Sequence, residues 1–388
     1  MYAVTSYTVV DNYKANSVFF VGSTDPVPEP STQQRGRGRP IARGNASSRG
    51  RSRSRRTGIR GTRAPSAMTW DVYDDRDDYC PDRLVDFTQR RGVLVDTTDY
   101  TPLQYFNLFF SDEVFTLIAD QTNAYAVQFF DAPAQLPRHS RFKKWEDTSS
   151  EEIKAFIAIQ IAMGLCQKNS LEDYWESWWL THTDFGSIMP RNRYELISSF
   201  LHFEDNQAER PKKGQDGYDF MWKVRKMMSL CEEKYEEVYA PGKNLSIDES
   251  IIGFKGRVQI RQYLPSKPTR WGVKQYVLCE SATGYALKFI TYLGKNTIAL
   301  KDGFGATESI VLNLLEDYTN KGHVVFTDNF YSSPALFQAL ERLQIGACGT
   351  VKSGRQNMPR DIAPNQLVLK KGDDPVFRRW NNLAACAW

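Results

Sequence analysis

The stretch GKNLSIDESIIGFKGR, residues 242–257, decides the fold of this chain. Its short run of apolar and β-branched side chains predicts a buried strand, and Asp248 stands inside it. A glycine-containing basic segment follows at once. Because burying an unpaired carboxylate is costly, two explanations are open: Asp248 binds a metal ion, or the strand simply ends at the surface there.

The segments after this strand predict a mixed sheet covered by helices. Strands are expected at KQYVLCES, YALKFITYLG, HVVFTDNF and GACGTVK, and helices at TESIVLNLLEDYTN and SPALFQALERL. The resulting order is strand, strand, strand, helix, strand, helix, strand. A meander of three strands followed by helix-linked strands is the ribonuclease-H-like arrangement.

Helical spacing of apolar residues dominates from about residue 98 to residue 241. The segment TSSEEIKAFIAIQIAMGLCQ opens with a capping-box pattern, Ser149 to Glu152, and continues with apolar residues at helical spacing. RNRYELISSFLHFEDN and YDFMWKVRKMMSLCEEKYEEVY predict two further amphipathic helices. The fold class is therefore α+β (mixed), with a helical domain ahead of the sheet.

Positive charge is concentrated near the N-terminus. Eleven arginines, no lysine and no acid lie between Arg35 and Arg63; taking them from the net charge of +4 leaves −7 for the rest. Residues 24–67 are rich in Pro, Gly, Ser and Arg and too poor in large apolar residues to offset chain entropy, which predicts disorder. Within them Arg37, Gly38 and Arg39 resemble the core of an AT-hook, which lies in a narrow A·T-rich minor groove. The alternative is an arginine-rich tract that binds nucleic acid non-specifically or acts as a nuclear localisation signal.

A second aspartate, Asp328, stands at the end of the fourth predicted strand, HVVFTDNF. If the first strand of the meander pairs with this strand, Asp248 and Asp328 become neighbours. Two carboxylates a few ångströms apart repel each other unless a cation neutralises them. Mg²⁺ (or Mn²⁺) suits one or two carboxylates completed by waters and substrate phosphates, and such ions serve in-line phosphoryl transfer. The alternative is that each aspartate only caps a junction between a strand and a turn.

The segment FKGRVQIRQYLPSKPTRWGVK, directly after the first strand, combines cations with aromatic residues. Lys and Arg neutralise phosphates, while aromatic faces can stack on unpaired bases. Solvated surface charge is the alternative. The cations expected to contact DNA are Lys255, Arg257, Arg261, Lys267 and Lys274.

Other functional classes have little support. The longest apolar stretch, Ala155 to Cys166, is too short for the roughly 20 residues of a membrane helix, so no membrane contact is expected. The six cysteines are scattered without a CxxC pair, so neither a disulfide framework nor a zinc site is predicted.

Seven segments, in order, resemble the piggyBac transposases and the host proteins derived from them: MGLCQKNSLEDYWE, RNRYELISSFLHFEDN, PGKNLSIDESIIGFKGR, RQYLPSKPTRWGVKQYVLCESATGY, YLGK, FTDNFYSSPALFQAL and GTVKSGRQNMP. The resemblance covers about residues 98–388. It implies a helical dimerisation and DNA-binding domain, then a ribonuclease-H-like domain that cuts and joins double-stranded DNA, between transposon ends and TTAA-type targets, by Mg²⁺-dependent transesterification. It also implies a homodimer and a nuclear location.

By motif, the resemblance makes Asp248 of SIDES and Asp328 of TDNF the first two catalytic aspartates and metal ligands. Asn329 would help to set the hydrogen bonds of the active site. Lys352 and Arg355 of GTVKSGR resemble a basic pair that faces target DNA. The implied divisions are a tail (1–97), a helical domain (98–244), a transposase domain (245–355) and the start of an insertion region (356–388).

The family's third aspartate lies in a later helix, and no acid of this chain matches it. The resemblance therefore implies a C-terminally truncated transposase that is inactive as given. One alternative is a domesticated DNA-binding or chromatin-associated host protein that keeps the fold without the chemistry. Another is an RNA-binding protein that uses the tract RGRSRSRR.

Overall fold

The computed structural model describes residues 68–73, 84–132, 136–176, 184–265, 267–294 and 297–388, together with the backbone of 17–21. The chain divides into two compact units, one of residues 85–326 and one of residues 1–84 with 327–388. Mixed helix and sheet make an α+β fold. The AT-hook-like core, Arg37 to Arg39, lies outside the described residues.

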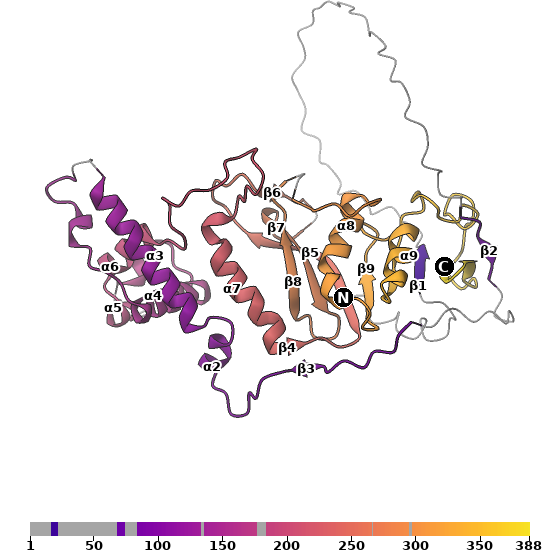
Figure 1. Ribbon diagram of the computed structural model, residues 1–388, viewed down its shortest axis with the longest axis horizontal. Coiled ribbons are helices and arrows are strands. Elements are labelled where there is room, and N and C mark those ends of the chain that lie inside the picture. The colour runs from indigo at the N-terminus through magenta and orange to yellow at the C-terminus, as the bar shows by residue number, and fades with distance from the viewer. Residues whose placement is uncertain are drawn as a thin grey trace, which may run out of the picture. The chain divides into compact units, whose positions relative to one another are not determined.

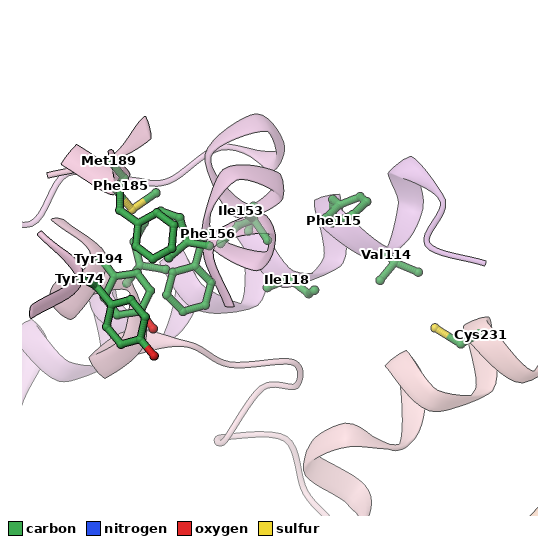
Figure 2. Close-up of a cluster of buried hydrophobic side chains, with 13 residues drawn as sticks. Val114, Phe115, Ile118, Ile153, Phe156, Tyr174, Phe185, Met189, Tyr194 and Cys231 are labelled. Carbon is green, nitrogen blue, oxygen red and sulfur yellow. The ribbon is translucent and has the colours of Figure 1, made fainter. Parts of the chain in front are cut away.

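The first half of the 85–326 unit is helical, as the apolar spacing predicts. Its helices are α2 (Pro102–Asn107), α3 (Asp112–Asp131), α4 (Ser150–Leu165), α5 (Phe185–Ile188), α6 (Arg191–Phe200) and α7 (Trp222–Val238), with 3-10 turns η1 (Arg141–Lys144) and η2 (Glu172–Tyr174). Figure 2 shows the core between them, where Phe156 of α4 lies against Tyr194 of α6 with their ring centroids 5.0 Å apart. None of the helices in the described part of the chain has the length and apolar character that crossing a bilayer requires.

The start of α4 differs in one respect from the predicted capping box. Ser149 caps the helix, because its hydroxyl accepts the Glu152 N–H at 3.3 Å. The Glu152 carboxylate does not close the box. It accepts the Thr148 hydroxyl at 2.7 Å and pairs with Arg193 of α6 at 2.5 Å, so the side chain joins two helices instead of sealing one.

The second half of this unit is a sheet with helices. Its elements are β5 (Asn244–Gly253), β6 (Arg261–Tyr263), β7 (Trp271–Glu280), β8 (Ala286–Thr291), α8 (Ala306–Leu314), η3 (Glu316–Tyr318) and β9 (Val324–Thr327), whose last residue belongs to the other unit. The strand order is β9-β5-β7-β6, and β8 also pairs with β7. The predicted meander and the pairing of its first strand with the strand after α8 are confirmed. Helix α7 lies along β8 (Figure 1).

The antiparallel pairing of β5 with β7 sets which side chains face the core. It runs without a break from Leu245 opposite Glu280 to Gly253 opposite Gly272. Leu245 and Ile247 are buried on one face, whereas Asp248 points to the other and its side chain is 69% exposed. The expectation that Asp248 lies in a buried environment is therefore wrong, because the strand is covered on one face only.

A buried carboxylate fixes the end of β7. Glu280 is 6% exposed and accepts three hydrogen bonds, from the Tyr239 hydroxyl at 2.5 Å, the Gly242 N–H at 2.7 Å and the Thr283 hydroxyl at 2.6 Å. Tyr239 belongs to β4 (Tyr239–Ala240), which pairs with β3 (Gly92–Val93). Burial acts to raise the pKa of Glu280, but these hydrogen bonds outweigh it and hold the pKa below its usual value.

The other unit contains α9 and a second group of strands. Its elements are β1 (Ser17–Val21), β2 (Asp71–Val72), α9 (Pro334–Arg342), β10 (Gly346–Thr350), β11 (Val376–Trp380) and β12 (Leu383–Ala387), in the strand order β2-β11-β12-β1-β10. Helix α9 begins as predicted, with Ser333 capping the Leu336 N–H at 3.2 Å and Pro334 in its first turn. Strand β1 pairs in parallel with both β10 and β12, so the expected tail of residues 1–97 contributes a strand to this sheet.

Replacing Gly272 by Ala is expected to destabilise the β5–β7 pair, because the added Cβ would lie 2.2 Å from the carbonyl oxygen of Ile252. Forced overpacking costs about 1–3 kcal/mol of unfolding free energy, which urea unfolding measures. Gly164→Ala in α4 is the matched control: its Cβ meets nothing within 4 Å. The control is expected to be neutral or stabilising by up to about 1 kcal/mol. Equal unfolding free energies for the two variants would contradict the close approach at Gly272.

Replacing Glu280 by Gln is expected to cost about 1.5–3 kcal/mol at neutral pH, since an amide cannot accept all three hydrogen bonds of the buried carboxylate. Because folding lowers the pKa of Glu280, its contribution is complete above the unfolded value near 4.5 and is lost as the pH falls through the folded value. Urea unfolding from pH 7 to pH 3.5 should therefore show the difference between wild type and Glu280→Gln shrinking below about pH 4.5. A difference independent of pH would mean that folding does not shift the pKa of Glu280.

Candidate active site

Asp248 lies at the centre of β5 with its carboxylate open to solvent. Its Oδ1 accepts the N–H of Glu249 at 2.7 Å, and the ammonium of Lys267 lies 4.0 Å from Oδ2. Lys267 is only partly exposed and comes from the loop between β6 and β7. The structure thus places one predicted DNA-contacting cation beside the predicted metal ligand.

Glu249 and Lys274 form a separate pair on the opposite face of the sheet. Both side chains are 14% exposed, and Lys274 Nζ lies 3.1 Å from Glu249 Oε1 and 4.6 Å from the ring centroid of Tyr276. Burial and the Glu249 charge raise the pKa of Tyr276 to about 12. Because side chains alternate along a strand, Lys274 shares a face with Glu249, not with Asp248. Lys274 is therefore not brought together with Asp248, and its charge is already compensated.

Asp328 opens a tight turn directly after β9. Its Oδ1 accepts the Phe330 N–H at 2.9 Å, and its carbonyl oxygen accepts the Ser332 N–H at 3.1 Å and the Ser332 hydroxyl at 2.8 Å. This arrangement is an Asx-turn, in which the side chain of an aspartate takes the place of a backbone acceptor. The base of the turn lies very close to the backbone of β10. A Cβ on Gly349 would lie 2.3 Å from the carbonyl oxygen of Thr327.

A cavity of about 1040 Å³ adjoins this turn in the same unit. It is lined by Asn329 and by the loop of residues 350–366, which supplies Lys352, Arg355 and Arg360. Asn329 is exposed and faces this cavity; no hydrogen bond of its side-chain amide is found within the described residues. The predicted residues Asn329, Lys352 and Arg355 are thus brought together around one cavity beside Asp328.

The loop after β5 carries two further predicted DNA contacts. Lys255 and Arg257 are exposed, as DNA-contacting cations need to be. Arg261 differs, because its Nη1 donates to the carbonyl oxygens of Lys255 at 2.9 Å and Gly256 at 3.0 Å, and its guanidinium lies 4.7 Å from the Trp271 ring. Trp271 and Tyr263 lie against each other, about half exposed. Nothing in the spacing of the sequence distinguishes Arg261 from its exposed neighbours.

The donor chemistry of the two aspartates suits a hard divalent ion. Both side chains are exposed and offer carboxylate oxygens. Asp248 lies on β5, and Asp328 directly follows β9, which is the neighbour of β5 in the sheet order. Among the described residues, no three or more His, Cys, Asp or Glu side chains are grouped so that they could hold a metal ion. Asp248 and Asp328 belong to different units, so a shared ion stays a prediction.

Comparison with known proteins agrees with the fold. The family model described as Transposase IS4 matches residues 101–388. PiggyBac transposable element-derived protein 3 of Homo sapiens is 29% identical over 282 residues, covering 71% of this chain and 44% of that protein. PiggyBac transposable element-derived protein 5 of Homo sapiens is 20% identical over 298 residues, covering 74% of this chain and 54% of that protein.

One solved structure also resembles this chain: the cryo-EM structure of the piggyBac transposase synaptic complex with hairpin DNA. The TM-score is 0.61 at 26% identity, covering 75% of this chain and 58% of that one. The chain spans about half the length of the curated relatives it matches. Because the family model covers nearly three quarters of the chain and the relatives share one name, the chain belongs to the piggyBac family of transposases and transposable element-derived proteins.

Proposed function

We propose that this chain binds double-stranded DNA and carries two of the carboxylates of a metal-dependent phosphoryl-transfer core, Asp248 and Asp328. The observation that supports this best is that Asp248 lies on β5 and Asp328 directly follows β9, the neighbour of β5 in the sheet order, and that both carboxylates are exposed. The solved structure of the piggyBac transposase is a complex with hairpin DNA, which supports DNA as the partner.

In this proposal each of the two aspartates is a ligand of Mg²⁺ or Mn²⁺. The ion, when bound, supplies the positive charge that in-line phosphoryl transfer needs. Lys267, 4.0 Å from Asp248, stands where it can pair with a DNA phosphate once the carboxylate has a metal partner. Lys255, Arg257 and Lys352 are exposed and neutralise further phosphates along the duplex.

Two of the later aspartates have hydrogen-bond partners of their own. Asp361 accepts Arg378 Nε at 2.6 Å, and Asp373 accepts the Lys370 N–H at 2.7 Å. No later aspartate is matched to a third ligand, and two carboxylates alone hold metal weakly. We accordingly expect the chain by itself to bind DNA without cutting it. Transposon ends, a TTAA-type target, a homodimer and a nuclear location complete the proposal.

The 388-residue chain is expected to bind a duplex bearing TTAA with an affinity that falls steeply as salt rises, and to leave the duplex uncut in Mg²⁺ or Mn²⁺. Fluorescence anisotropy over a salt series and a nicking assay on labelled DNA measure the two properties. Replacing both Lys255 and Arg257 by Gln should lower the slope of log affinity against log salt by about 2.

The control is Lys288→Gln, because Lys288 of β8 pairs with Asp317 at 2.6 Å and is not a predicted DNA contact. Absence of salt-sensitive binding would remove the proposed DNA function. Cleavage that disappears in Asp248→Ala would instead show that two carboxylates are sufficient for chemistry.

A further inference from the structure

The predicted basic pair, Lys352 and Arg355, differs in exposure and in hydrogen bonding. Lys352 is exposed, and no hydrogen bond or ion pair of its ammonium is found within the described residues. Arg355 is half-buried, and its Nη2 donates to two backbone carbonyls, those of Asn329 at 3.4 Å and of Phe330. Its Nε is buried and has no hydrogen-bond partner among the described atoms.

This geometry removes the feature that makes arginine a good phosphate ligand. A guanidinium binds phosphate best as a fork, with two parallel N–H groups from Nη1 and Nη2 or from Nε and Nη2. Both forks need Nη2, which is already committed to the two carbonyls, and one also needs the buried Nε. Nη1 remains, but it cannot form a two-nitrogen fork by itself.

The two carbonyls that Arg355 holds belong to the turn that carries Asp328. The base of that turn is fixed by the Thr327 and Ser332 hydroxyls, 2.9 Å apart, and by the close approach of Gly349. Its tip, Asn329 to Phe330, is exposed or half-exposed and projects beside the cavity. Arg355 reaches this tip from outside the turn, because its Nη2 donates to both tip carbonyls.

We propose that Arg355 is a positioning residue: it holds the tip of the Asp328 turn through the carbonyl oxygens of Asn329 and Phe330, and it does not contact DNA. Lys352 alone serves as the DNA-contacting cation of the pair. The consequence for chemistry rests on the proposed function, in which Asp328 is a metal ligand. Without the tether the Phe330 N–H moves, and with it the hydrogen bond that orients Asp328 Oδ1.

Three variants separate positioning from DNA contact: Arg355→Gln, Arg355→Lys and Lys352→Gln. In hydrogen exchange followed by mass spectrometry, we expect peptides covering residues 328–333 to exchange at least several-fold faster in both Arg355 variants and at the wild-type rate in Lys352→Gln. Arg355→Lys keeps the charge but loses the planar fork, so it distinguishes geometry from electrostatics. Peptides from α9 should exchange as in wild type, which excludes general unfolding.

In DNA binding over a salt series, we expect Lys352→Gln to differ from wild type and Arg355→Gln not to differ. The slope of log affinity against log salt should fall by about 1 in Lys352→Gln and stay unchanged in Arg355→Gln. Mn²⁺ binding, followed by its electron paramagnetic resonance signal, should weaken several-fold in Arg355→Gln and not in Lys352→Gln, an effect that a general loss of stability would not confine to one variant.

Either a lower salt slope in Arg355→Gln, or amides of the turn that exchange at the wild-type rate in that variant, overturns the proposal. If the wild-type chain does not bind DNA at all, the proposed function fails. The exchange comparison still decides the role of Arg355 in that case, because it requires no DNA.

Discussion

The pairing of β5 with β7 is the constraint on which the rest of the 85–326 unit depends. Side chains alternate along a strand, so a slip of one residue would move Asp248 into the core and bring Ile247 to the surface. The register is set where Gly272 lets the β7 backbone approach Ile252 so closely that a side chain would not fit. Gly272, which has no side chain, thus helps to determine the face of the sheet on which Asp248 lies.

The same pairing separates two sets of charges. On the face that carries Leu245 and Ile247, Glu249 and Lys274 neutralise each other beside Tyr276. A partner removed from such a buried pair leaves an uncompensated charge, which is far more costly than the pair itself. On the other face, Asp248 and Lys267 are open to solvent and to ligands. Adjacent acids in the motif SIDES therefore have opposite roles, one structural and one available for binding.

Much of the fold could be predicted from the sequence, because strong apolar periodicity and capping residues act locally. The order of β5, β7, β8, α8, β9, α9 and β10 and the adjacency of β5 and β9 followed from it, whereas the short strand β6 was not predicted. The exposure of Asp248 did not, since one strand cannot show which of its faces is covered. The partners of Lys274 and Arg355 were not predicted either, because each cation binds an acceptor from another strand or turn. The sequence alone does not show whether a Lys or Arg side chain has such a partner.

Strand β1 lies between β10 and β12, parallel to both. Its neighbours come much later in the sequence, so this sheet cannot close until Leu383–Ala387 have been synthesised. Contacts between such distant segments form slowly, because the entropy of closing a long loop is lost before any pairing compensates for it. Until then an unpaired strand edge is available to other chains. The late closure of this sheet makes the yield of native protein sensitive to chaperones and to the rate of synthesis.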